Sequence, residues 1–420
     1  MVIKASNLFY FLSFIVFSNV IVKSIGISGL SDSTNKIDFL ILIVLSIFVF
    51  PLYKKANSPS IKGMLILFSG YILLSLVSSH RALNGFAFGQ MILNFKFPLL
   101  ILFFYIIDLR NINLNKVERY FLILICLNIF FILLEIVLPN LHHSIFKGAV
   151  TNTIVQGTSI TRYTGFFIHP AAMGIFASIC FLWGTSKLLS KQINNISIAL
   201  TLLSLVCLFF SGQRMELGAC LLITSFILAI KFLNRGAIKL ILVTFLFVII
   251  TFIVLYLKQI NSFNMSLIDE GHARSVLYLG AFQLANEFFP FGSGLGTFGS
   301  SMSLNNENAM YQYLGIASYW WFEGASFLTD THWAMIIGES GYLASIFYFL
   351  FLANIFYVCY RNYINQPKSN FIPILGCMLI TFSFFSSLAT PIYAGTLLPI
   401  LILSFIITLN FHVIDNKRQV

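Results

Sequence analysis

The stretch LILVTFLFVIITFIVLYL, residues 240–257, carries no charge, and it leads directly into the longest polar part of the chain. A helix that crosses the hydrocarbon core of a bilayer needs roughly 20 apolar residues, which this stretch and the residues just before it supply. Residues 258–331 then form the longest run that cannot span a membrane. A chain this apolar that keeps one long polar excursion is expected to carry its chemistry there.

The composition around this stretch indicates a polytopic membrane protein. The chain has 420 residues, of which 58% are hydrophobic and 9% are charged, and its mean hydropathy is +0.91. No soluble domain of this length could solvate such a surface. The net charge of +11 therefore does not indicate a nucleic-acid partner; its distribution among the loops matters more.

The apolar segments predict an all-α protein with about twelve transmembrane helices, in a range of ten to twelve. Each segment is near the length that a bilayer requires. The whole chain is then a single membrane domain, 1–420, in which 258–331 is a large loop between the ninth and tenth spans. The expected spans are 8–27, 38–53, 64–79, 91–108, 119–138, 170–186, 196–212, 214–232, 237–257, 333–358, 371–387 and 393–411.

The basic residues predict the orientation. Sixteen of the 25 Lys and Arg residues fall in alternate short loops or at the termini, and cytoplasmic loops carry such an excess. Both termini are therefore expected in the cytoplasm and the long loop outside. The sixteen are Lys4, Lys54, Lys55, Lys62, Arg110, Lys116, Arg119, Lys187, Lys191, Lys231, Arg235, Lys239, Arg361, Lys368, Lys417 and Arg418.

The first candidate motif, RYTGFFIHP at 162–170, closes an outer loop. Pro170 suits the first position of the following helix. Arg162 and Tyr163 serve either as interface anchors or as ligands of an anion, and His169 either satisfies a backbone carbonyl or lines a site.

A second motif, SGQR at 211–214, is a tight outer turn between two spans. Ser211 can cap the next helix, whose free amides and dipole favour an anion beside Arg214. Snorkelling of Arg214 to the headgroups is the simpler alternative.

Two further motifs lie in and just after the long loop. His272 and Arg274 precede a segment with an apolar helical face, which is expected to lie in the membrane interface. In the glycine-rich stretch 290–299, Gly294 and Gly296 are candidates to let the backbone approach a ligand.

At the loop's end, Asp330 and His332 precede Glu339, which lies seven residues after His332 and so on the same helical face, roughly 10 Å away. A carboxylate beside a histidine is a candidate general base. Capping by Asp330 and a buried hydrogen bond of Glu339 are the structural alternatives.

Together these four motifs resemble the superfamily of bacterial O-antigen ligases and polymerases. The resemblance runs from Arg162 to Gly341, and the order of the motifs is more specific than any one of them. Ligases of this superfamily carry a histidine, ten residues and then a glycine at the start of the next helix. Counting back from Gly341 puts Asp330 in that histidine's position, and His332 two residues late. This departure favours the polymerase branch.

The resemblance implies a membrane-embedded, GT-C-like glycosyltransferase of the bacterial inner membrane, acting at the periplasmic face. Its substrates would be undecaprenyl-diphosphate-linked oligosaccharide donors and acceptors within the membrane lipids, with a chain-length-regulating membrane protein as a further partner. Arg162, Arg214 and Arg274 would hold the diphosphate. Asp330 or His332 would deprotonate the acceptor hydroxyl, with Glu339 in support and Tyr163, His169, His272, Gly294 and Gly296 lining the substrate. No metal or other cofactor is expected.

Two alternatives remain open. An O-antigen ligase, which transfers finished polymer onto a lipid A core, belongs to the same class. A flippase for the same lipid-linked sugar is a transporter, and transporters more often show repeated halves and polar residues at mid-membrane.

Overall fold

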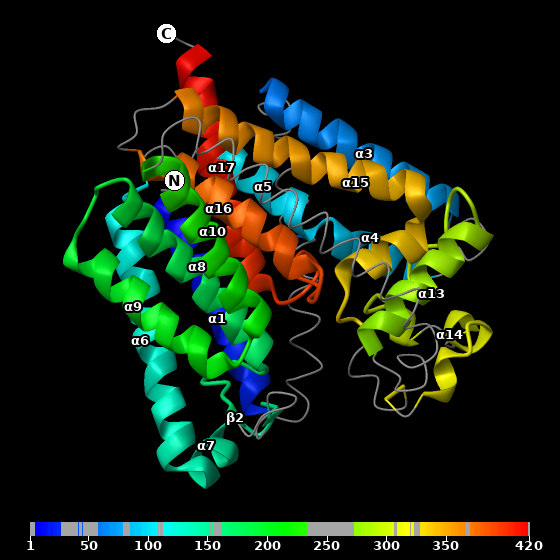
Figure 1. Cartoon of the computed structure of the whole chain (residues 1–420), viewed down its shortest axis with the longest axis horizontal. Coiled ribbons are helices and arrows are strands. Elements are labelled where there is room, and N and C mark those ends of the chain that lie inside the picture. The colour runs from blue at the N-terminus through cyan, green and yellow to red at the C-terminus, as the bar shows by residue number, and fades with distance from the viewer. Residues whose placement is uncertain are drawn as a thin grey trace. The chain divides into compact units, whose positions relative to one another are not determined.

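The computed structural model describes residues 5–26, 41, 44, 58–78, 85–107, 109, 112–150, 153–154, 161–232, 273–305, 309–319, 321–322, 328–365 and 370–418. The expected span 237–257, nearly all of 38–53, and the candidate His272 lie outside these residues. The described chain is helical apart from two short paired strands, so the predicted all-α class is confirmed there (Figure 1).

The contacts within the chain divide it into two compact units. Unit 1 comprises residues 1–70, 92–220 and 347–420, and unit 2 comprises 71–91 and 221–346. Several helices pass from one unit into the other, because the division falls inside α3, α4, α10 and α15.

Unit 1 is a helical bundle. Its helices are α1 (Ala5–Ile25), the first part of α3 (Pro59–Ser78), α5 (Lys96–Ile107), α6 (Leu114–Val137), α7 (Pro139–Ile145), α8 (Pro170–Leu189), α9 (Asn195–Ser211), the start of α10 (Arg214–Phe232), the second part of α15 (His332–Asn365), α16 (Phe371–Ser387) and α17 (Leu397–Arg418). The antiparallel strands β1 (Thr153–Ile154) and β2 (Thr161–Arg162) pair Thr153 with Arg162.

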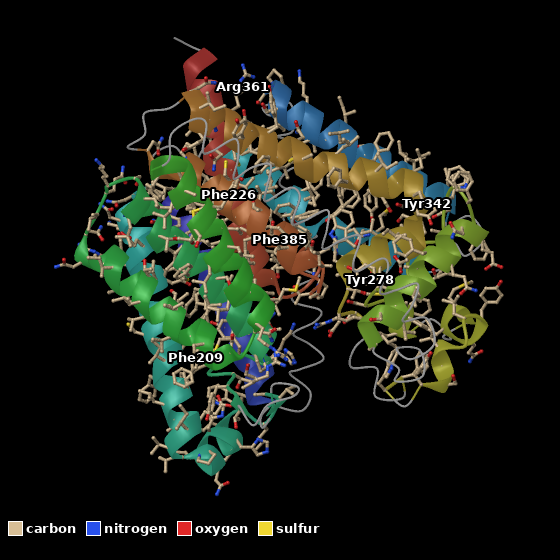
Figure 2. The ribbon with its side chains drawn as sticks, viewed as in Figure 1. Phe209, Phe226, Tyr278, Tyr342, Arg361 and Phe385 are labelled. Atoms are coloured by element: carbon tan, nitrogen blue, oxygen red, sulfur yellow. The ribbon has the colours of Figure 1, made fainter. Side chains whose placement is uncertain are left out.

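Helix α8 is the centre of unit 1. In its apolar stretch 89% of the residues are buried inside the protein. The corresponding share is 33–44% in the other four helices that are long enough to cross a membrane. It packs against α9, α16 and α17, and its fully buried Trp183 meets Phe121 and Phe371 edge-on at 5.3 and 5.5 Å. The outer face of α9 is instead apolar and exposed, and Phe209 projects from it with 64% of its surface accessible (Figure 2). Such a face suits lipid rather than water.

Five helices have the length and composition to cross a membrane, or six if the bent pair of α4 (Gly85–Asn94) and α5 counts as one span, among the residues that the structure describes. Three shorter apolar helices, Asn195–Ser211, Phe371–Ser387 and Leu397–Val413, add to these. The chain is therefore a helical membrane protein in the part described. The predicted span 91–108 begins earlier, at Gly85, and bends by 45° between α4 and α5.

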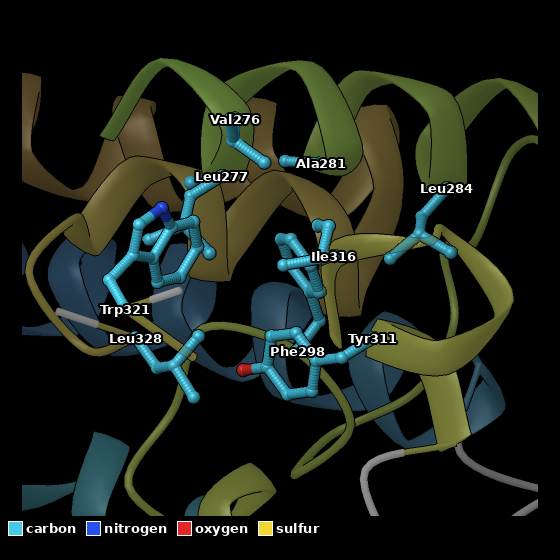
Figure 3. Close-up of a cluster of buried hydrophobic side chains, with 10 residues drawn as sticks. Val276, Leu277, Ala281, Leu284, Phe298, Tyr311, Ile316, Trp321 and Leu328 are labelled. Atoms are coloured by element: carbon cyan, nitrogen blue, oxygen red, sulfur yellow. The ribbon is translucent and has the colours of Figure 1, made fainter. Parts of the chain in front are cut away.

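Unit 2 contains most of the loop that was expected to be polar and external, and it has its own hydrophobic core (Figure 3). Its elements include α13 (Ala273–Glu287), α14 (Ala309–Tyr313), the 3-10 turns Ser303–Asn305 and Ile316–Ser318, and the first part of α15. Leu277, Ala281 and Leu284 on α13 pack with Phe298 and Tyr311. Protein therefore covers this apolar face, so the face gives no reason to place α13 in the membrane interface. An apolar stripe along a helix predicts that the face is buried, but it does not predict whether lipid or protein covers it.

Helix α15 is broken where the glycine-rich stretch meets it. Gly341 has φ +72° and ψ −178°, a conformation that essentially only glycine adopts. The break leaves backbone carbonyls without helical partners. Ser293 donates from its amide to the Gly338 carbonyl at 2.9 Å, and Gly294 donates to the Glu339 carbonyl at 2.8 Å. The glycine-rich stretch thus completes the hydrogen bonding of a broken helix.

Candidate functional site

The first two sequence motifs meet in unit 1. Arg162, at the end of β2, donates from Nε to the Ser211 carbonyl at 3.3 Å. The backbone amide of its neighbour Tyr163 donates to the Phe210 carbonyl at 2.9 Å. The chain segment with Arg162 is therefore joined to the turn that leads into Arg214, the exposed first residue of α10. Two of the three predicted arginines thus belong to one local structure.

Gln213 ties this structure to the start of α8. With its amide oxygen facing the donors, it accepts from the Ala171 amide at 3.1 Å and from the Arg162 guanidinium. Gln213 lies within the SGQR motif, but nothing in the motif singled it out. It fixes the guanidinium from a second direction, which reduces the side-chain freedom that ligand binding would otherwise have to remove.

His169 caps α8; the simpler sequence interpretation expected its ring to satisfy a backbone carbonyl, whereas it accepts from a backbone amide. Its Nδ1 accepts from the Ala171 amide at 3.1 Å, and Pro170 is the first residue of α8, as predicted. The pKa of His169 is lowered to about 4, first by desolvation of the ring and then by the nearby Arg162 charge. Part of the side chain still reaches the surface. The imidazole is therefore neutral at neutral pH, with its proton on Nε2.

Ser211 was expected to cap the following helix, but it is the last residue of α9 and bonds Gln213, which lies before α10. Its hydroxyl accepts from the Gln213 amide at 3.3 Å and donates to the Leu208 carbonyl at 2.7 Å. Gly212 makes the turn with φ +61°, a conformation that glycine adopts without steric cost.

Unit 2 brings together the third arginine and the candidate base. Arg274, on the first turn of α13, donates from Nη2 to Oδ2 of Asp330 at 3.3 Å. The two side chains are 54% and 29% exposed. An exposed ion pair of this kind contributes less than about 1 kcal/mol to stability, so it is readily exchanged for a stronger ligand.

His332 and Glu339 are buried in the same unit. His332 is the first residue of α15 and is 2% exposed, and Glu339 is 1% exposed. Glu339 accepts from the Phe298 amide at 3.1 Å, and the backbone of Gly296 and Thr297 and the side chain of Ser300 hydrogen-bond it as well. Glu339 therefore anchors the glycine-rich stretch; a catalytic role for it stays a prediction.

Gly294 and Gly296 are also inside unit 2. Both are buried, and a Cβ at Gly296 would lie 2.9 Å from the Phe86 carbonyl oxygen on α4. The close approach that these glycines permit is thus to the protein's own backbone. Their role in lining a substrate remains a prediction.

Tyr311 is a further residue that the sequence did not indicate. Its hydroxyl accepts from the Gly299 amide at 2.8 Å and bonds Ser303 at 2.8 Å. Burial raises the pKa of Tyr311 to about 12, so the phenol stays protonated and keeps both contacts. It extends the support of the glycine-rich stretch from α15 to α14.

Among the residues that the structure describes, no group of three or more His, Cys, Asp or Glu side chains gathers in a way that could hold a metal ion. Compared with protein families, the chain matches no family model, and the comparison with curated proteins gave no match.

Proposed function

We propose that the protein is a polysaccharide polymerase, a glycosyltransferase that joins undecaprenyl-diphosphate-linked oligosaccharides at the periplasmic face of a bacterial inner membrane. The resemblance of the four motifs motivates the proposal. The observation that carries it is the Arg274–Asp330 ion pair, which joins a proposed phosphate ligand to a proposed base across 56 residues of chain.

The exposed pair suggests how a ligand would activate the base. A guanidinium makes two parallel hydrogen bonds to a phosphate, and a diphosphate carries more charge than one carboxylate. A lipid diphosphate would therefore take Arg274 from Asp330. The released carboxylate could then accept the proton of an acceptor hydroxyl while that oxygen attacks the anomeric carbon of the donor.

In this reaction the new glycosidic bond forms as the bond from the anomeric carbon to the diphosphate breaks. The diphosphate leaves with the bonding electron pair, and arginine side chains stabilise its developing charge. Arg274 is the side chain that we assign to the phosphate oxygens beside Asp330, and Arg162 and Arg214 are proposed as phosphate ligands of unit 1. With both termini in the cytoplasm, the basic loops face inward as the sequence predicts.

Exposure ranks the candidate bases. Asp330 is 29% exposed, whereas His332 and Glu339 are almost fully buried. A substrate could reach Asp330 without any movement of α15. We therefore assign the proton transfer to Asp330 and give His332 the role of holding the start of the helix in place.

The test is glycan length in the native host. A strain without this chain is complemented with Arg274→Ala or Arg274→Lys at matched membrane abundance. We expect glycans of a single repeat unit from Arg274→Ala and a strongly shortened ladder from Arg274→Lys, which keeps the charge but loses the fork. Arg361→Ala, an exposed arginine near the other end of α15, is the matched control and should give full-length glycan.

The same experiment separates the alternatives. Loss of surface glycan altogether, rather than a single unit, would indicate a ligase or a flippase. Full-length glycan from Arg274→Ala would remove the ion pair from the mechanism.

A further inference from the structure

A buried carboxylate on α6 holds the segment between β2 and α8. Glu135 is 7% exposed, and its Oε2 accepts from the Thr164 amide at 2.9 Å and from the Gly165 amide at 3.0 Å. The Thr164 hydroxyl donates to the same oxygen at 3.4 Å. One carboxylate oxygen thus takes up two consecutive backbone donors and a side-chain donor, which an ionised oxygen does better than a neutral one.

Further contacts fix the same segment. Nε2 of His142, on α7, lies 2.8 Å from the Gly165 carbonyl oxygen and 3.8 Å from Glu135 Oε2. Gly165 has φ +59°, and a Cβ there would lie 2.2 Å from Oδ1 of Asn128. Any other residue at 165 would collide with α6, so the segment fits in one way.

The fixed segment lies between the two side chains that define the first motif. Arg162 precedes Thr164 by two residues, and His169 follows Gly165 by four. Because Arg162 also bonds the Ser211–Arg214 turn, the position of Thr164 and Gly165 decides where the guanidinium lies relative to that turn. The Glu135 contact therefore acts on the proposed phosphate ligand through the backbone.

Unit 2 uses the same arrangement independently. The buried Glu339 accepts backbone amides of the glycine-rich stretch, among them Phe298 at 3.1 Å, in the same unit as the Arg274–Asp330 pair. In each unit a helical carboxylate with little exposure accepts from the backbone of a glycine-containing segment, and the same unit holds a proposed phosphate-binding arginine. This recurrence supports a common purpose.

We propose that Glu135 is a positioning residue of the anion site: it holds the 162–169 segment so that Arg162 presents its guanidinium to a lipid diphosphate. The inference rests on the proposed function. It predicts that Glu135 is needed for affinity although it does not touch the ligand.

The test measures binding of undecaprenyl diphosphate to the full chain in lipid nanodiscs. We expect Glu135→Ala to bind about tenfold more weakly or worse, since it removes three hydrogen bonds, two of them to backbone amides. Glu135→Gln keeps an acceptor oxygen at the same place and should recover most of the affinity. Glu118→Gln is the matched control: it removes a buried carboxylate from the same helix, about 25 Å away along its axis, where Glu118 pairs with Lys187 at 2.6 Å.

The control should lower thermal stability but leave affinity unchanged in the folded fraction. If Glu135→Ala does not accumulate, Glu135→Asp, whose carboxylate is one methylene shorter, replaces it and should also bind more weakly. Affinity equal to the unmodified protein in Glu135→Ala, or an equal loss in Glu118→Gln, would overturn the positioning role.

Failure of the proposed function gives a different result. If the unmodified protein does not bind undecaprenyl diphosphate, the diphosphate site itself is refuted and the role of Glu135 with it. If the unmodified protein binds and Arg162→Ala weakens binding while Glu135→Ala does not, only the positioning role is lost.

Discussion

Replacing Gly341 with alanine tests whether the break in α15 holds unit 2 together. A Cβ at this position would lie 2.3 Å from the Pro290 carbonyl oxygen and 2.6 Å from the Gly292 amide nitrogen. Both are backbone atoms, so no side-chain rotation relieves the overlap. The backbone conformation of Gly341 by itself costs a non-glycine residue about 1–3 kcal/mol.

With the steric overlap added, we expect Gly341→Ala to lower the free energy of unfolding by about 3 kcal/mol or more. The assay is thermal unfolding of the purified chain in detergent, together with membrane abundance and glycan length in the complemented strain. We expect an unfolding transition several degrees lower and a loss of polymer, because His332 and Asp330 lie at the start of the displaced half of α15.

Gly218→Ala provides the control. Gly218 lies in α10 with nothing within 4 Å of the position that a Cβ would take, so alanine should be neutral or should stabilise the helix by roughly 0.5–1 kcal/mol. If Gly341→Ala melted at the same temperature as Gly218→Ala and made normal polymer, the account of the broken helix would be refuted.

Two further predictions follow from exposure. Asp330→Asn should abolish polymer at unchanged membrane abundance, since an exposed ion pair adds little stability. His332→Ala should lower abundance and activity together because the ring is buried. Unchanged glycan from Asp330→Asn would place the base elsewhere. In a Cys126→Ala background, cysteines at the exposed positions Ser301 and Ser144 should react with a membrane-impermeant thiol reagent in intact spheroplasts, and one at Gln192 should not; labelling confined to Gln192 would reverse the orientation.

The sequence predicted the helical class and many helix positions well, because apolar length is a strong signal in a membrane protein. The start of α8 was equally local, because Pro170 is its first residue as predicted; Ser211 lies at the end of α9 and does not cap α10. The motif resemblance assigned Arg274 and Asp330 to the same reaction but did not predict that their side chains touch. The geometry of this contact required the packing of α13 onto the core of unit 2.

Charges inside apolar segments were the signal that the sequence interpretation left unused. Lys187 was counted as a cytoplasmic loop charge, yet it is buried and paired with Glu118. Lys96 was not among the sixteen loop charges, and it is 5% exposed and donates to the Ala394 carbonyl at 3.3 Å. A charge within a span is costly and indicates a specific partner, but the partner comes from a distant segment and only the fold identifies it.

Three acidic residues of the described chain differ in the hydrogen-bond donors that their carboxylates accept. Glu135 and Glu339 are buried and accept from backbone amides, Glu135 in the segment that follows Arg162 and Glu339 in the glycine-rich stretch of unit 2. Asp330 is partly exposed and takes a guanidinium, which a substrate can replace. A substrate cannot reach a buried carboxylate that accepts backbone amides unless the surrounding segment moves, whereas a carboxylate held by a surface arginine can be released by a competing phosphate. This difference, rather than nearness in sequence to the long loop, is why the proton transfer is assigned to Asp330 and the positioning to the two glutamates.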